Sequence, residues 1–131
     1  MTASRILLPA GWPRPKGYAN GILATGRTIW VAGQIGWDTA GNFAPDLASQ
    51  TELALRNIVA VLAEADAKPE HIVRLTWFLT DVADYEANLG AVGAAYGRVM
   101  GRHFPAMTVV QVVRLVERKA LIEIEAVAVL P

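Results

Sequence analysis

The sequence predicts a single domain of the α+β class, in which two helices pack on one face of a mixed β-sheet. Segments with the composition of strands are separated by two segments of helical periodicity, in the order β-β-α-β-α-β-β. The chain has 131 residues, 53% of them hydrophobic, which is enough to bury a core of ordinary size. No repeat, low-complexity stretch or interdomain linker divides the sequence, so residues 1–131 are expected to form one domain.

The amino-terminal part is expected to form a loop and then a β-hairpin. Residues 9–17 contain three prolines and two glycines, a composition typical of a loop. Residues 18–23 and 28–31 follow as two short strands. The Thr-Gly-Arg sequence at 25–27 between them is typical of a hairpin turn, so the two strands are expected to pair.

The first helix is expected to begin at Asp46 or Ser49, both good N-cap residues, and to run to about Ala65. Its apolar residues recur at spacings of three and four, which places them in one buried stripe. The members of this stripe are Leu55, Ile58, Val59 and Leu62. Pro69 is expected to prevent the helix from continuing.

A strand and a second helix are expected next. Residues 72–80 are rich in β-branched and aromatic residues, which favours a strand. Alternation along it places one set of side chains on one face: Val73, Leu75, Trp77 and Leu79. The second helix is expected to begin at Asp81 or Asp84 and to run to about Met100, with three glycines that lower its helix propensity.

Two strands, residues 107–115 and 120–129, are expected to end the chain as a hairpin. Both faces of the last strand are apolar. One face carries Ile122, Ile124, Ala126 and Ala128, and the other Leu121, Val127 and Val129. Because two helices cover only one face of a sheet, the second face is expected to meet another subunit in a homo-oligomer.

Composition excludes several classes of function. The 12 basic and 12 acidic residues balance, and the isoelectric point is about 6.7, which argues against a nucleic-acid partner. The absence of cysteine excludes disulfides and thiolate catalysis. His71 and His103 have no acidic residue at a metal-ligand spacing, so no metal site is expected. No segment has the length of a membrane span or the pattern of a signal peptide, which predicts a cytoplasmic protein without membrane contact.

The last strand also carries two acidic residues, Glu123 and Glu125. They are two positions apart, so both side chains point to the same side of the strand, roughly 6–7 Å from each other. One interpretation is a carboxylate in a cleft, which suits the activation of water. The other is a solvated strand face on which the two pair with Arg114 and Arg118. The residues alone leave both interpretations open.

Five short motifs, in order along nearly the whole chain, resemble the RidA/YjgF family, whose best-known members hydrolyse reactive enamines and imines. They are Gly-Tyr-Ala-Asn-Gly at 17–21, Ala-Gly-Gln-Ile at 32–35, Gln-Thr followed by Ala-Leu-Arg-Asn within 50–57, the segment 104–113 that begins Phe-Pro-Ala, and Ile-Glu-Ile-Glu-Ala at 122–126. Each motif alone is short, but five in the same order are specific.

The resemblance implies a homotrimer similar in architecture to chorismate mutase, with a small-molecule metabolite bound in clefts between subunits and no metal or organic cofactor. It implies that one subunit supplies Tyr18, Ala32 and Gly33 to the cleft. It further implies that the neighbouring subunit supplies Met107, Thr108, Val109 and Glu123. In the family chemistry Glu123 would hold the attacking water, as the catalytic residue, while main-chain N–H groups near Gly33 and Val109 hold the substrate.

Met107 departs from the family pattern, which typically has an arginine there that grips the substrate carboxylate. Arginine binds a carboxylate through two parallel charged hydrogen bonds, whereas methionine offers an apolar thioether. Desolvating an unpaired carboxylate beside it is unfavourable. The ligand is therefore expected to lack this carboxylate or to bind it elsewhere, and Arg14, Lys16 and Arg102 are the candidate replacement cations.

Two classes of function are consistent with these residues. The first is an enzyme that hydrolyses an enamine or imine without the usual carboxylate anchor. The second is a non-catalytic trimer that binds a ligand or a partner protein in the same clefts. A ribonuclease, as reported for some relatives, is disfavoured by the zero net charge and by the absence of a histidine pair.

Overall fold

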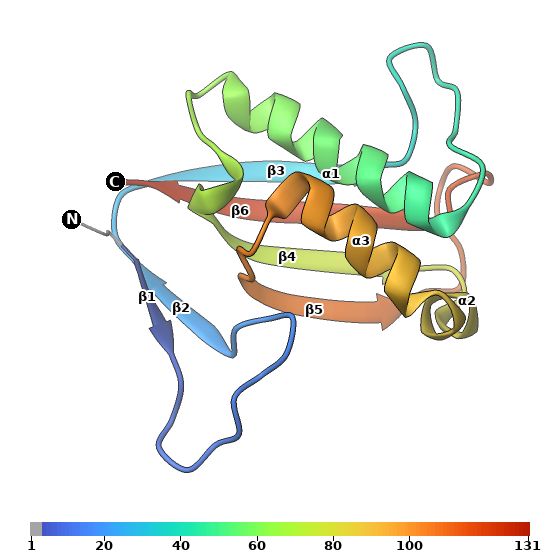
Figure 1. The fold of residues 1–131 in the computed structure, drawn as a ribbon. Coiled ribbons are helices and arrows are strands. Elements are labelled where there is room, and N and C mark those ends of the chain that lie inside the picture. Colours follow the sequence, from blue (N-terminus) through green and yellow to red (C-terminus); the bar gives the residue numbers. More distant parts are fainter. Residues whose placement is uncertain (1–3) are drawn as a thin grey trace.

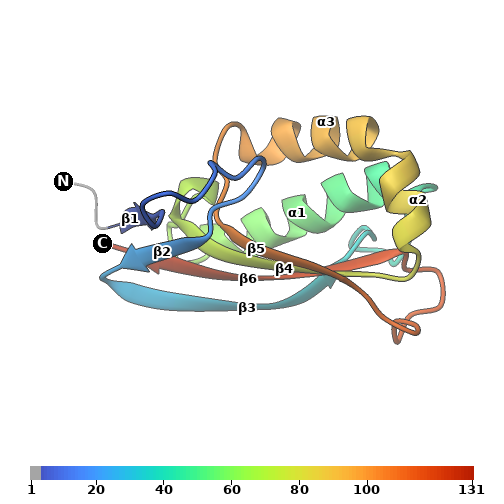
Figure 2. The same cartoon turned by 90° about the horizontal axis from the view of Figure 1, so that it is seen from below.

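The computed structural model describes residues 4–131 and confirms the α+β class, with two main helices on a mixed sheet (Figure 1). The main sheet has the order β3-β6-β4-β5. Its strands are β3 (Arg27–Ile35), β6 (Ile122–Leu130), β4 (Ile72–Leu79) and β5 (Ala106–Gln111). The helices α1 (Leu47–Ala63) and α3 (Leu89–Met100) lie side by side over one face of this sheet, as Figure 2 shows from below. Residues 1–3 of the expected domain lie outside the described range.

The expected amino-terminal hairpin is wrong. Strand β2 (Gly21–Ala24) pairs antiparallel with an unpredicted strand, β1 (Ser4–Leu7), while β3 pairs antiparallel with β6. Gly26 links the two sheets with φ 147°, and a Cβ atom there would overlap the main-chain carbonyl of Leu130. The glycine therefore lets the chain pass close to the end of β6, and does not close a turn between β2 and β3.

The expected carboxy-terminal hairpin is also wrong. Strand β5 runs parallel to β4, and β6 is inserted antiparallel between β3 and β4. The parallel β4–β5 pair requires a crossover connection, which the helices between them supply. Strand β6 takes the central position because it is apolar on the face toward the helices, where Ile122, Ile124, Ala126, Ala128 and Leu130 are buried.

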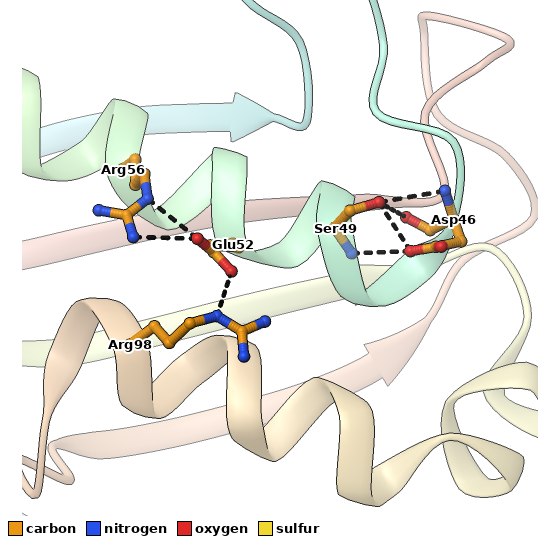
Figure 3. Close-up of polar contacts among 5 residues, drawn as sticks. All are labelled: Asp46, Ser49, Glu52, Arg56 and Arg98. Carbon is orange, nitrogen blue, oxygen red and sulfur yellow. Dashed lines mark hydrogen bonds and ion pairs between the residues drawn. The ribbon is translucent and has the colours of Figure 1, made fainter.

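The first helix begins where the sequence predicts. Asp46 is the N-cap, and its carboxylate accepts a hydrogen bond of 2.8 Å from the main-chain N–H of Ser49 (Figure 3). Glu52 then joins α1 to α3, because it lies 2.6 Å from Nε of Arg98 and 2.9 Å from the Arg56 guanidinium. A 3-10 turn, η1 (Pro69–His71), follows α1 and leads into β4.

The expected second helix is divided in two. Asp81 caps α2 (Val82–Ala87) by accepting hydrogen bonds from the main-chain N–H groups of Ala83 and Asp84. The chain then leaves helical geometry at Asn88, with φ −126° and ψ 26°. The Asn88 amide donates back to Asp84, at 2.8 Å to both its main-chain and side-chain oxygens, which stabilises the break.

The second face of the sheet carries apolar side chains without a helical cover in the part of the chain that the structure describes (Figure 2). Trp30 is 77% exposed there, and Val127, its cross-strand partner, is half-buried. Loops cover only the end near Ile35 and Phe78. This exposed apolar face agrees with the expectation of a partner subunit, which stays a prediction.

Within residues 4–131, no helix has the length and apolar character needed to cross a membrane.

Candidate functional site

A pocket of about 530 Å³ lies between β4, β5, α3 and the loop that precedes Tyr18. Its walls are mainly apolar. They are formed by Lys16, Gly17, Tyr18, Trp77, Tyr85, Leu89, Val92, Gly93, Tyr96, Phe104, Met107 and Val109. Three of the predicted site residues, Tyr18, Met107 and Val109, are therefore brought together in one cavity of a single chain.

The strand register places Met107 and Val109 on this wall. Met107 is the neighbour of Leu75 and Val109 that of Trp77 across the parallel β4–β5 pair. Leu75 and Trp77 are buried beneath the helices. Paired residues on adjacent strands share a face of the sheet, so both β5 side chains point to the helical side. The thioether of Met107 therefore stands where the resemblance implies an arginine.

The loop carrying Tyr18 is anchored beside β5. Gly17 adopts φ 79°, a conformation that favours glycine. Ala19 is buried, and its main-chain N–H donates a hydrogen bond of 3.0 Å to the Pro105 carbonyl. Tyr18, between these two positions, keeps 43% of its surface exposed. This anchoring holds the tyrosine ring at the open side of the pocket.

The interior of the pocket is lined by aromatic rings that contact one another in succession. Trp77 contacts Tyr85 and Tyr96, with ring centroids 6.4 and 6.1 Å away, and Tyr96 stacks on Phe104 at 5.6 Å with an interplanar angle of 8°. The Tyr96 hydroxyl donates a hydrogen bond to the carbonyl of His103. Burial raises the pKa of the Tyr96 phenol above its ordinary value, so the group is neutral at physiological pH.

The indole N–H of Trp77 is buried and has no acceptor among residues 4–131. An unpaired buried donor is costly, and most such groups in proteins do have a partner. Trp77, which lines the pocket, therefore carries one buried hydrogen-bond donor without a partner in the described chain.

The remaining predicted residues lie on the opposite face of the sheet. Glu123 is the cross-strand neighbour of Ile35 and Phe78, and Thr108 that of Thr76, so both side chains point away from the helices. Ala32 and Gly33 are exposed at an irregularity in the β3–β6 register. A Cβ atom at position 33 would overlap the Glu123 carboxylate, which shows how closely the two residues lie.

One chain does not bring together two residues that are expected on one wall of the cleft, and which subunit supplies each of them stays a prediction. The resemblance implies that Met107 and Glu123 form one wall, but they project from opposite faces of the sheet. Met107 pairs with Leu75 of β4, whereas Glu123 pairs with Phe78, whose side chain points to the other face. Glu123 instead shares a surface with Gly33, and Met107 shares one with Tyr18. A cleft that uses all of these residues requires two chains, with the Gly33 and Glu123 surface of one against the Tyr18 and Met107 pocket of the other.

The three candidate cations separate into two places. Lys16 lines the pocket that contains Met107. Arg14 and Arg102 line a different cavity of about 790 Å³ beneath the β1–β2 hairpin. Lys16 is therefore the only one of these three cations next to the apolar wall.

Four pocket residues are absent from the site predicted from the sequence: Tyr85, Leu89, Val92 and Tyr96. The sequence does contain a signal for them, because their spacings of four, three and four make one helical stripe that continues across the break at Asn88.

No group of three His, Cys, Asp or Glu residues within 4–131 has the geometry of a metal site.

Comparisons with known proteins show the family and support the fold. Residues 13–130 match the family model described as Endoribonuclease L-PSP. The RutC family protein UK114 of Drosophila melanogaster is 33% identical over 95% of this chain and 88% of its own. A 2-iminobutanoate/2-iminopropanoate deaminase of Rattus norvegicus is 34% identical over 86% of this chain and 79% of its own. The crystal structure of the Rid family protein YyfB of Yersinia pestis superposes with a TM-score of 0.86 at 32% identity, covering 98% of this chain and all of that one.

Proposed function

The chain belongs to the Endoribonuclease L-PSP family, also called RidA/YjgF, and from that premise we propose that it is a homotrimeric deaminase for an enamine or imine that is not anchored by a carboxylate at position 107. Residues 1–131 would act as one domain. The observation that carries the proposal is the Met107 thioether in the aromatic pocket. A relative of 34% identity is named as an imine deaminase, which supports the reaction class.

The proposed cleft combines two chains. One chain supplies the pocket wall of Tyr18, Met107 and Val109, and the neighbouring chain supplies the surface of Gly33 and Glu123. The exposed apolar face of the sheet, with Trp30 77% exposed, supports an assembly through this region. Thr108 and Ala32, which lie on the same sheet face as Glu123 or at its edge, then belong to the contact between subunits.

The proposed reaction is hydrolysis of a carbon–nitrogen double bond. Glu123 accepts a proton from a bound water as the water oxygen bonds to the imine carbon, and the same proton then passes from Glu123 to the nitrogen. The carbon–nitrogen bond of the resulting carbinolamine then breaks, giving a carbonyl compound and ammonia. An enamine first becomes its imine tautomer by protonation at carbon. One imine and one water therefore yield one carbonyl and one ammonia, with no redox change and no cofactor.

Ammonia release tests the proposal. An amine oxidase generates 1-phenylethanimine, which has no carboxylate, and the purified protein should accelerate its hydrolysis above the buffer rate. Glu123→Gln should lower kcat by about 100-fold or more, as expected for loss of a general base. Glu125→Gln is the matched control, because Glu125 is an exposed carboxylate two residues along the same strand. Equal activity of the wild type and Glu123→Gln would contradict the assigned role.

The second candidate is a non-catalytic trimer that binds a ligand or partner in the same cleft. The same Met107 wall favours it, because the charged group on which the usual family substrates depend is missing. In that case no imine would be hydrolysed above the buffer rate, while ligands would still raise the melting temperature.

The description of the family, Endoribonuclease L-PSP, names a third activity, the cleavage of RNA. RNA cleavage that persists through purification and disappears in Glu123→Gln would favour that activity over both candidates.

A further inference from the structure

Lys16 is the one charged residue, among residues 4–131, that lines the pocket containing Met107. It is exposed, and the pocket lining contains neither Asp nor Glu. Both ion pairs found within the described chain involve Glu52, so neither uses Lys16. The ammonium group is therefore available to an anionic ligand.

The position of Lys16 is restrained by its neighbours. Gly17 makes a turn with φ 79°, and Ala19 forms an isolated parallel bridge with Ala106 at the start of β5. The lysine is thus three residues from a point fixed against the same strand that carries Met107. Its four-carbon stem carries the ammonium group several ångströms from the backbone, so the charge reaches the pocket from its exposed side.

The interior of the pocket favours an aromatic group. The rings of Trp77, Tyr96 and Phe104 follow one another with centroid separations of 6.1 and 5.6 Å. Planar ligands gain offset-stacked and edge-to-face contacts with such rings, and these contacts add to the gain from burying apolar area. The thioether of Met107 is also a favourable partner for an aromatic ring.

We propose that this pocket selects a small aromatic anion, with its ring against the wall that Trp77, Tyr96 and Phe104 form and its anionic group at Lys16 on the exposed side. The inference rests on the proposed function for the location of the ligand site, but it does not require turnover. It moves the anion anchor from the β5 strand to the loop before Tyr18. A short aliphatic acid cannot fill the aromatic interior while its carboxylate is held at Lys16, so such acids are poor ligands.

Calorimetric titration with three stable carbonyl compounds tests this selectivity. Phenylglyoxylate has both the ring and the carboxylate, acetophenone has only the ring, and pyruvate has only the carboxylate. Phenylglyoxylate should bind most tightly. Lys16→Gln should weaken phenylglyoxylate binding by about 2-fold to 5-fold at low salt, the size expected for one exposed charge contact, and should leave acetophenone unchanged. Lys16→Arg should preserve the affinity.

Arg14→Gln provides the matched control, because it removes a positive charge from the same loop but from a residue that lines the other cavity. Its affinity for phenylglyoxylate should equal that of the wild type. The inference is overturned if Lys16→Gln and wild type bind phenylglyoxylate equally, if no probe binds, or if pyruvate binds as tightly as phenylglyoxylate. A failure of the proposed deaminase activity can be told apart from a failure of this inference. If only the deaminase activity is wrong, phenylglyoxylate still binds in a Lys16-dependent way, but no imine is hydrolysed.

Discussion

Gly33 of β3 and Glu123 of β6 lie against each other, so closely that a Cβ atom on the glycine would overlap the glutamate carboxylate. The contact occurs where the β3–β6 register shifts between Val31 and Gln34. Irregularities of this kind often redirect a side chain beside a functional site. The missing side chain at position 33 therefore determines where the carboxylate of Glu123 lies.

Gly33→Ala is expected to displace this carboxylate. Because Glu123 is flexible, the methyl group should move its side chain and leave the strand pairing intact. We expect kcat for imine hydrolysis to fall by about 10-fold to 100-fold, because a displacement of about 1 Å in a catalytic group lowers the rate by this amount. The free energy of unfolding should change by less than about 1 kcal/mol. Steady-state kinetics and urea denaturation measure the two quantities. An unchanged kcat would mean that the Glu123 position does not matter to the reaction.

Gly97→Ala is expected to stabilise the protein. Gly97 is an exposed residue within α3, and a Cβ atom there would meet nothing within 4 Å. Alanine removes the conformational freedom of glycine from the unfolded chain, so the free energy of unfolding should rise by about 0.5–1 kcal/mol. Urea denaturation monitored by circular dichroism measures the change. A loss of stability would show that position 97 has a neighbour that the single chain does not contain.

The ion pairs of Glu52 predict a dependence of stability on pH. Hydrogen bonds and charge from Arg98, and then from Arg56, lower the pKa of Glu52 below its ordinary value of 4.5. A lowered pKa in the folded state gives stability that is present above the ordinary value and is lost as the pH falls through the folded-state value.

Glu52→Gln should therefore be less stable than the wild type at pH 7, and this difference should disappear as the pH is lowered well below 4.5. The effect is small because both arginines are largely exposed. Urea midpoints measured for both proteins from pH 7 to pH 3 provide the comparison. A difference that persists unchanged at acidic pH would contradict an ionic origin.

The sequence predicts the elements of this fold better than their pairing. The Asp46 cap and the buried stripe of α1 are local patterns. The cap is confirmed, and so are three members of the stripe, Leu55, Ile58 and Leu62, whereas Val59 is only half-buried. The two expected hairpins are wrong because pairing depends on contacts between distant segments. Gly26, for example, is positioned by Leu130, which follows it by more than 100 residues.

The candidate site shows the same limit. The motif around Met107 predicts a place in a ligand cleft between subunits, and this stays a prediction; within one chain Met107 lines an apolar pocket. Sequence cannot place Met107 and Glu123 relative to each other, because their faces of the sheet follow from the β4–β5 and β4–β6 registers. The aromatic interior was missed because its residues belong to β4, α2, α3 and a loop, and only folding brings these elements together.

The central claim is that the Met107 thioether leaves the pocket without a fixed anion grip on β5. The most direct test compares kcat/KM of the wild type and Met107→Arg for 2-iminopropanoate, formed from 2-aminoacrylate in situ. Arginine should restore a charge-assisted contact worth about 1.5–3 kcal/mol, so the variant should exceed the wild type by about 10-fold to 100-fold. A wild type that already hydrolyses this substrate as fast as Met107→Arg would contradict the claim.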